Sequence, residues 1–205
     1  MITKERIITI FKNAAQKIIN AKDELTAIDA KFGDADHGVT MEKIGNAIIT
    51  ALDSLKDEAV GIKTLFGACA DEIMKINGGA AVPLWNTLFE GFKNGAADTQ
   101  EISAGDFKRL FQSALEEISG LTPAKVGDKT MMDALIPAVE AITACPGDDP
   151  AQITGAGAEA ARKGAQESAN MISKFGRAKS YKEKTIGTPD AGAMSMMYFF
   201  TGLSD

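Results

Sequence analysis

The chain has 205 residues, of which 45% are hydrophobic and 24% charged, and its formal net charge is −6. This composition is ordinary for a globular protein, and we expect a single domain over residues 1–205. The basic residues form no stripe, which argues against a nucleic-acid partner. No run of about 18 apolar residues occurs, so we expect no membrane span. Two cysteines and an N-terminus without an apolar signal region favour a cytoplasmic location.

Apolar residues recur at helical spacing along almost the whole chain, and no alternating stretch competes with this period. Ser103 and Asp106 have the spacing of a helix-capping box, and Asp149 before Pro150 marks another helix start. We expect eight helices, over residues 7–19, 41–55, 62–76, 83–95, 103–118, 130–142, 150–173 and 190–203. The sequence therefore predicts an all-α fold.

Short connections between consecutive helices favour antiparallel neighbours, which predicts an eight-helix up-and-down bundle or barrel. Alternate connections then lie at the same end of the bundle, namely residues 29–38, 78–81, 120–130 and 174–189. The last of these is predicted to be a long polar loop. The remaining connections, residues 56–60, 95–102 and 144–149, resemble plain surface loops. Glycine, capping and arginine signals thus converge on one rim.

Three carboxylates, Asp29, Asp34 and Asp36, lie beside the sole histidine, His37, in the first of these connections. Carboxylates held so close repel one another unless a cation lies among them, and Mg²⁺ prefers oxygen ligands. The helix that follows offers free N–H groups, which attract anions. A purely structural alternative remains open at this point, in which Asp36 is a helix cap and the glycines form turns.

Three familiar motifs are absent or misplaced. An EF-hand loop fails because Gly38 offers no side chain at the fifth position and Gly45 replaces the closing glutamate. Residues 155–160 match a dinucleotide-binding fingerprint, but they lie inside an expected helix with no strand before them. No Gly-x4-Gly-Lys-Ser/Thr sequence occurs, which excludes a conventional P-loop kinase.

Several motifs nevertheless follow one another in a distinctive order along the chain. They are Asp29-x4-Asp34-Ala-Asp36-His37-Gly38, Gly78-Gly79-Ala80, Gly127-Asp-Lys-Thr130-Met131-Met132-Asp133-Ala134-Leu135, Gly176-Arg177-Ala178, and Ile186-Gly187 with Asp190-Ala-Gly192-Ala193. Over essentially its whole length the chain resembles the L subunit of the dihydroxyacetone kinase family, the nucleotide-binding component. The resemblance implies an eight-helix antiparallel barrel with nucleotide bound at one rim through Mg²⁺.

The resemblance also implies roles for individual residues. Asp29, Asp34 and Asp36 would hold two Mg²⁺ ions that bridge the phosphates of ADP or ATP. The nucleotide would be bound by His37, Gly38, Thr40, Met41, Gly79, Ala80, Ala81, Gly120, Thr130, Met131, Arg177, Asp190 and Gly192. Catalytic roles would fall to Arg177, at the phosphates, and to His37, as an orienting group rather than a base.

Simpler roles for some of these residues remain open from the sequence alone. Met131 equally suits core packing, and Asp190 reads as an ordinary helix N-cap. His37 suits a turn or capping role, and Arg177 suits a solvated loop charge. The sequence does not decide between these roles.

The implied function is that of an ADP- or ATP-binding kinase subunit, active only with partner subunits, in glycerol and short-ketose metabolism. A separate K subunit would hold the ketose, and an M subunit of the phosphotransferase system would recharge the nucleotide. A related branch uses ATP instead, and a homodimer is left open. Two alternatives are a noncatalytic nucleotide-sensing module and a helical bundle that holds a lipid.

The chain departs from the family pattern at several positions. Ala81 and Val82 replace the usual Ser and Gly after Gly-Gly-Ala, which removes a hydroxyl and is expected to narrow the backbone approach. The segment Tyr181-Lys-Glu-Lys184-Thr185 replaces Leu-Gly-Glu-Arg-Ser, and Ala191 replaces a proline. We therefore expect a divergent member, whose ketose, a triose or a tetrose, is open.

Overall fold

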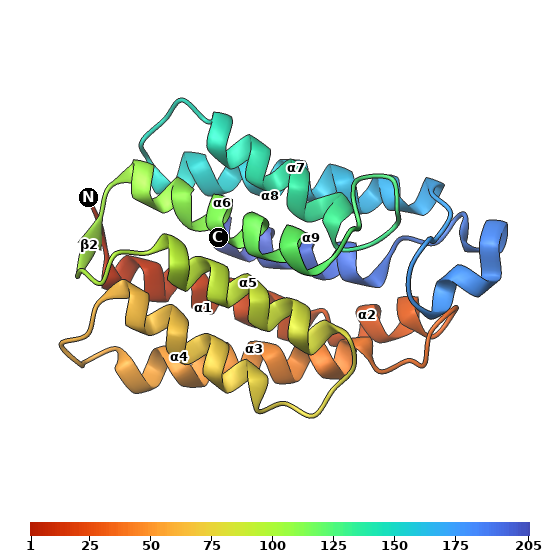
Figure 1. Cartoon of the computed structure of the whole chain (residues 1–205), viewed down its shortest axis with the longest axis horizontal. Helices are drawn as coiled ribbons and strands as arrows, with labels where there is room; N and C mark the ends of the chain where they lie inside the picture. Colours follow the sequence, from red (N-terminus) through yellow and green to blue (C-terminus); the bar gives the residue numbers. More distant parts are fainter.

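The computed structural model describes residues 1–205 and is built almost entirely of helices (Figure 1). The α-helices are α1 (Lys4–Asn20), α2 (Lys22–Asp29), α3 (His37–Leu55), α4 (Ile62–Met74), α5 (Ala81–Gly95), α6 (Ala104–Leu121), α7 (Met132–Ala144), α8 (Pro150–Glu167) and α9 (Ala191–Ser204). Two 3₁₀ helices follow α8, η1 (Ser168–Asn170) and η2 (Arg177–Thr185). The predicted all-α fold is confirmed.

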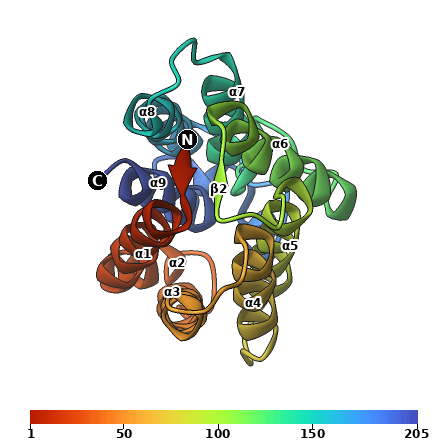
Figure 2. The same cartoon turned by 90° about the vertical axis from the view of Figure 1, so that its left-hand side faces the viewer.

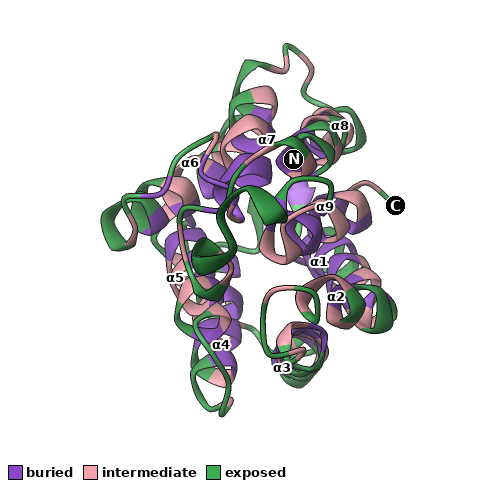
Figure 3. Cartoon of the chain, turned by 90° about the vertical axis from the view of Figure 1, so that its right-hand side faces the viewer, coloured by how far each residue is buried: buried purple, intermediate pink, exposed green.

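The long helices close into a ring, as the end view in Figure 2 shows. Each of α3 to α8 packs against the next α-helix in the chain, and α9 packs back against α1, which in turn contacts α3. The connections after α2, α4, α6 and α8 all lie at the right-hand end of the molecule in Figure 1. This end, which Figure 3 views directly, is called the rim below. The convergence predicted from alternate connections is therefore present.

The helices differ from the sequence predictions in three places. The segment after the first helix is not simply a turn, because α2 forms there after a break at Ala21, where φ is −86° and ψ is 2°. The seventh expected helix ends at Glu167 instead of Ser173, and residues 174–189 contain η2 rather than loop alone. At this exit the buried Ser168 hydroxyl donates to Ala165 O and accepts from the Asp190 N–H, which helps to turn the chain out of the helix.

Two very short strands, β1 (Ile2–Thr3) and β2 (Glu101–Ile102), were not expected. They pair antiparallel at the end opposite the rim, with Ile2 facing Ile102. Strands of two residues are too short to show an alternating pattern, so the sequence carries no signal for them.

The interior of the ring is filled by aromatic side chains from five helices, α1, α4, α5, α6 and α9. The Phe11 ring lies 4.9 Å from Phe66 and 5.3 Å from Phe92, and Trp85 lies 5.4 Å from Phe199, all as centroid distances. Burying a side chain of this size contributes about 1.5–3 kcal/mol. Trp85 belongs both to this core and to the wall of the rim cavity, so the core supports the site directly.

Close packing explains one of the two glycines in the α8 motif that resembled a dinucleotide-binding fingerprint. A side chain at Gly157 would press on Ile142 of α7, whereas Gly155 has open space around it. The motif lies within a helix, and further along that helix a side chain at Gly164 would overlap the Asp133 backbone. None of the helices combines the length and the apolar character needed to cross a membrane.

Candidate functional site

The acidic connection between α2 and α3 folds around the carboxylate of Asp29. Its Oδ2 accepts hydrogen bonds from the backbone N–H groups of Asp36, at 3.1 Å, and His37, at 3.4 Å. Gly33 lies so close to this carboxylate that any Cβ at that position would overlap it. The glycine is therefore needed for the close approach, and the loop holds Asp29 in a fixed orientation.

Asp29, Asp34 and Asp36 come together in the lining of the rim cavity, where one carboxylate oxygen from each lies within 4.8 Å of the other two. Partial burial raises the pKa of Asp36, and the neighbouring carboxylates of Asp34 and Asp29 raise it further. This mutual repulsion is what a hard divalent cation relieves, and an all-oxygen donor set is the one that Mg²⁺ prefers. The residues present therefore fit a Mg²⁺ site.

Arg177 is the cation that contacts this acidic cluster. Its Nη2 lies 2.7 Å from Asp34 Oδ2, while 70% of its side chain stays exposed. A second contact joins the same two segments, because the Phe32 and Tyr181 rings lie 5.2 Å apart. The segment that carries η2 thus lies across the acidic loop.

His37 is held at the first turn of α3 by a residue from the last helix. Its Nε2 lies 2.6 Å from the Oγ of Ser195, whose hydroxyl donates to Ala191 O in α9. Burial lowers the pKa of His37, although Asp29 and Asp36 act against the shift. The lowered pKa favours the neutral imidazole, and the contact with Ser195 fixes the orientation of the ring.

A cavity of about 490 Å³ opens at the rim, within the size range of small-molecule sites. The predicted site residues that line it are Asp29, Asp34, Asp36, His37, Thr40, Gly79, Ala80, Ala81, Thr130, Met131, Arg177, Asp190 and Gly192. They come from five connections or helix starts that are distant in the sequence. The fold therefore brings most of the predicted set into one place.

Three predicted residues lie outside the cavity lining. Gly38 faces α2, where a Cβ would overlap the Lys22 carbonyl, so its small size serves helix packing. Met41 is completely buried in the core, and Gly120 is exposed in the last turn of α6 with open space around it. Thr122 and Ala124, just beyond α6, line the cavity where Gly120 was expected.

The structure adds residues that the sequence analysis did not single out. Phe32, Trp85 and Phe175 supply aromatic walls, and Lys129 supplies a buried cation. Ser195 contacts His37 from α9, a helix with several other hydroxyl side chains, so the sequence gives no signal that singles it out. Val82, expected to narrow the site, is buried and does not line the cavity, so that expectation was wrong.

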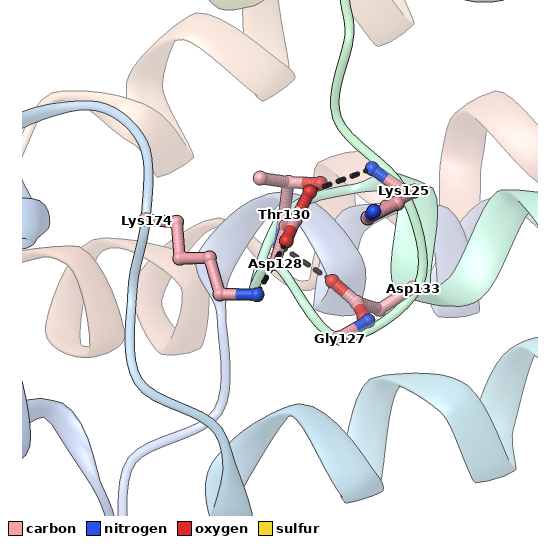
Figure 4. Close-up of polar contacts among 6 residues, drawn as sticks. All are labelled: Lys125, Gly127, Asp128, Thr130, Asp133 and Lys174. Atoms are coloured by element: carbon pink, nitrogen blue, oxygen red, sulfur yellow. Dashed lines mark hydrogen bonds and ion pairs between the residues drawn. The ribbon is translucent and has the colours of Figure 1, made fainter.

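The connection between α6 and α7 is organised by two carboxylates (Figure 4). Asp133, only 1% exposed, accepts from the N–H groups of Gly127 at 2.6 Å and Thr130 at 2.7 Å. Asp128 accepts from the Lys125 N–H at 3.0 Å and pairs with Lys174 at 2.7 Å, and these partners lower its pKa. The loop is thus tied to itself and to the segment that carries η2.

Asp190 occupies the N-cap of α9, as its position in the sequence suggested. Its Oδ2 accepts from the Ala193 N–H at 2.8 Å. Burial raises the pKa of Asp190 to about 7, and the nearby Asp133 carboxylate raises it further, while Lys129 opposes the shift. This carboxyl group therefore titrates near neutral pH in the wall of the cavity.

The ring of helices and the acidic cavity define a class of protein, the all-α barrel whose binding site is built from the loops of one rim. The sequence model of the DAK2 domain matches residues 31–205, and the chain belongs to this family. It is DhaL-like, since it is 25% identical to the "PEP-dependent dihydroxyacetone kinase, ADP-binding subunit DhaL" of Escherichia coli, over 99% of this chain and 97% of that one.

Larger kinases also contain a related region. The chain is 33% identical to an L-erythrulose kinase of Pectobacterium atrosepticum over 94% of its own length, but it spans only 33% of that protein. A crystal structure of the dihydroxyacetone kinase of C. freundii superposes with a TM-score of 0.73 and 24% identity, covering 97% of this chain and 34% of that one. The same protein with AMP-PNP and Mg²⁺ gives a TM-score of 0.71. At this identity, the superpositions establish the fold.

Proposed function

We propose that this chain is the nucleotide-binding subunit of a dihydroxyacetone-type kinase and holds ADP or ATP with Mg²⁺ in the rim cavity. The observation that carries the proposal is the acidic cluster, with three carboxylates within 4.8 Å of one another beside the first turn of α3. The position of the cluster beside the N-terminus of α3 matters because the start of a helix favours bound anions. The name of the E. coli relative, an ADP-binding subunit matched over nearly its full length, supports the same ligand.

Asp29, Asp34 and Asp36 would hold the metal, for which we propose two ions. When bound, Mg²⁺ would neutralise phosphate charge and hold the phosphates in place. Asp29 is already oriented by two backbone N–H groups, so the protein fixes one ligand before the metal arrives. The neighbour crystallised with AMP-PNP and Mg²⁺ is consistent with this assignment.

The phosphates would draw Arg177 toward them. Its guanidinium already lies 2.7 Å from Asp34, and a cation entering the cluster would compete with it for that carboxylate. The exposed, planar side chain is suited to bind phosphate oxygens through two parallel N–H groups. His37, fixed by Ser195, would orient the phosphate group rather than accept a proton, because phosphoryl transfer depends mainly on positioning and electrostatics.

The opposite wall is built from small residues at the start of α5. A Cβ at Gly79 would lie 3.7 Å from Asp36 Oδ2, so this glycine is next to the acidic cluster. Ala80 and Ala81 line the same wall. With Ala81 in place of the usual serine, the wall offers no hydroxyl there, and we propose that nucleotide contacts on this side are made by backbone groups.

The chain would not act alone on a sugar. We propose that a separate K subunit presents a short ketose to the bound nucleotide and that an M subunit of the phosphotransferase system recharges it, with free ATP as the alternative donor. Relatives named as dihydroxyacetone and erythrulose kinases support a triose or tetrose as the acceptor. The purpose of the rim would then be to hold the phosphoryl group where a second protein can present its substrate.

Calorimetry with ADP, in the presence and absence of Mg²⁺, tests the proposal. We expect binding that requires Mg²⁺, and a loss of affinity of about tenfold or more in Asp34→Asn, which is about 1.4 kcal/mol. Asp57→Asn, an exposed residue in the connection after α3, is the matched control and should bind as the parent does. If the parent protein and Asp34→Asn both bind ADP equally well with and without Mg²⁺, the proposal is contradicted.

Reconstitution with K and M subunits separates transfer from sensing. A transferring subunit will convert ketose to its phosphate in the mixture, whereas a sensing module will bind ADP without any product. A lipid that copurifies with a protein unable to bind ADP would favour the third alternative, the lipid-holding bundle.

A further inference from the structure

The segment between α8 and α9 forms a closed loop over the site. This segment, residues 171–187, is called the strap below. Near its base the Ser173 N–H donates to Thr185 Oγ1 at 3.1 Å, and the Gly187 N–H donates to Ala169 O at 2.7 Å. These hydrogen bonds close the segment near its base, joining its two arms.

A single buried ammonium group bridges these two arms from below. Lys129, in the connection between α6 and α7, is 4% exposed, and its Nζ donates to Met171 O at 3.0 Å and to Thr185 O at 2.6 Å. Its own backbone has φ of +60°, a conformation that side-chain-bearing residues rarely adopt. The loop thus places this side chain under the strap, with Asp133 and Asp190 near enough to balance its charge.

The tip of the strap carries the residue that contacts the acidic cluster. Arg177 follows Gly176, which has φ of +61°, and pairs with Asp34. Tyr181 packs on Phe32 of the same acidic loop. The strap therefore links the α6–α7 connection at its base to the proposed metal site at its tip.

We propose that Lys129 is a positioning residue, whose ammonium group holds the two arms of the strap together and so places Arg177 at the acidic cluster. The part of this inference that concerns nucleotide rests on the proposed function. The part that concerns the strap does not, since it can be measured without any ligand.

The chain offers a matched control for a buried lysine. Lys4 is 2% exposed, and its Nζ donates to Leu55 O at 3.3 Å and Glu58 O at 2.6 Å, at the end of the barrel opposite the rim. Lys129→Met and Lys4→Met each leave two carbonyl oxygens without their ammonium donor. A general loss of stability should affect both variants alike, whereas a specific role in the strap should affect only the first.

Hydrogen–deuterium exchange of the ligand-free protein tests the role in the strap. We expect peptides covering residues 171–187 to exchange about tenfold faster or more in Lys129→Met, and to keep parental rates in Lys4→Met. Lys129→Arg, which retains a cation with several N–H donors, should restore most of the protection. Parental strap exchange in Lys129→Met, or equal acceleration in Lys4→Met, would overturn the inference.

A double-mutant cycle on the affinity for ADP with Mg²⁺ tests the route through Arg177. Lys129 also lines the cavity, so a direct contact with nucleotide is the competing explanation. If Lys129 acts by placing Arg177, Lys129→Met and Arg177→Ala should each weaken binding, and the double variant should be no weaker than Arg177→Ala. Additive losses would overturn this route. If the parent protein fails to bind ADP with Mg²⁺, the proposed function falls, while the exchange experiment still decides the role of Lys129 in the strap.

Discussion

His37 Nε2 lies 2.6 Å from Ser195 Oγ, which ties the first turn of α3 to α9, the last helix of the chain. The ring itself closes through α1, which packs against both α9 and α3, and the His37–Ser195 contact joins these two flanking helices at the rim. It also fixes the imidazole next to the acidic cluster, so the geometry of the proposed metal site depends in part on a residue of the last helix.

Removing the hydroxyl at position 195 should loosen this pair. Ser195 is fully buried, so Ser195→Ala leaves the His37 ring nitrogen without its partner, at an expected cost of about 1–3 kcal/mol in the free energy of unfolding. Urea denaturation measures this loss. Ser54→Ala, which removes an exposed hydroxyl bonded to Ala51 O, should change stability by less than about 0.5 kcal/mol. Equal effects in the two variants would contradict the structural role of Ser195.

The titration of His37 can be observed directly, because it is the only histidine in the chain. Burial lowers its pKa, so we expect an NMR titration midpoint in the ligand-free protein below the usual value of about 6.5. A histidine pKa that is lower in the folded state favours the neutral form, so this group should reduce stability as the pH falls below about 6.5. A midpoint above that value would show that the carboxylates of Asp29 and Asp36 outweigh burial.

Asp190 should have the opposite dependence on pH. Its pKa is raised to about 7 in the folded protein, whereas an unfolded chain has the ordinary value of about 3.9, so its contribution to stability is lost as the pH rises from about 4 through 7. Asp190→Asn keeps a good helix cap without the charge. Urea midpoints should therefore show the variant gaining stability relative to the parent at pH 8, with the gain shrinking toward pH 5. A constant difference across that range would refute the raised pKa.

Two glycines at the rim should respond differently to the same substitution. Gly33→Ala places a methyl group against the Asp29 carboxylate, so it should weaken Mg²⁺-dependent ADP binding by about tenfold or more. Gly120→Ala adds a methyl group in open space within a helix and should keep ADP affinity, with stability unchanged or raised by up to about 1 kcal/mol. Calorimetry on the pair is the test. A large loss of affinity in Gly120→Ala would restore the nucleotide contact that the sequence analysis expected there.

Much of the site could be predicted because its signals are local. The acidic loop, the Gly78-Gly79 turn and the Asp190 cap each lie within a few neighbouring residues, and the order of alternate connections places them at one rim. Helix caps could be predicted for the same reason. Ser103 and Asp106 form the expected capping box, and α8 begins at Pro150 after Asp149, as expected. These features depend on backbone groups close by in the sequence, which is why the sequence reveals them.

Residues whose role depends on packing between distant segments could not be assigned. Gly38 and Gly120 were both expected to bind nucleotide. In the structure, however, Gly38 packs closely against α2, whereas Gly120 faces open space. Val82 follows two alanines that line the cavity, yet its own side chain is buried. The rotation of neighbouring helices decides which residues at the start of a helix face a cavity. No local sequence pattern predicts that rotation.

The sequence by itself determined most of the helical elements, the family resemblance and the acidic cluster, because hydrophobic period, capping chemistry and contiguous motifs are properties of neighbouring residues. Only the tertiary structure decided that Ser195 meets His37 and that Lys129 bridges Met171 and Thr185. Those contacts exist because the barrel closes and a buried polar group must find a partner, wherever in the chain that partner lies.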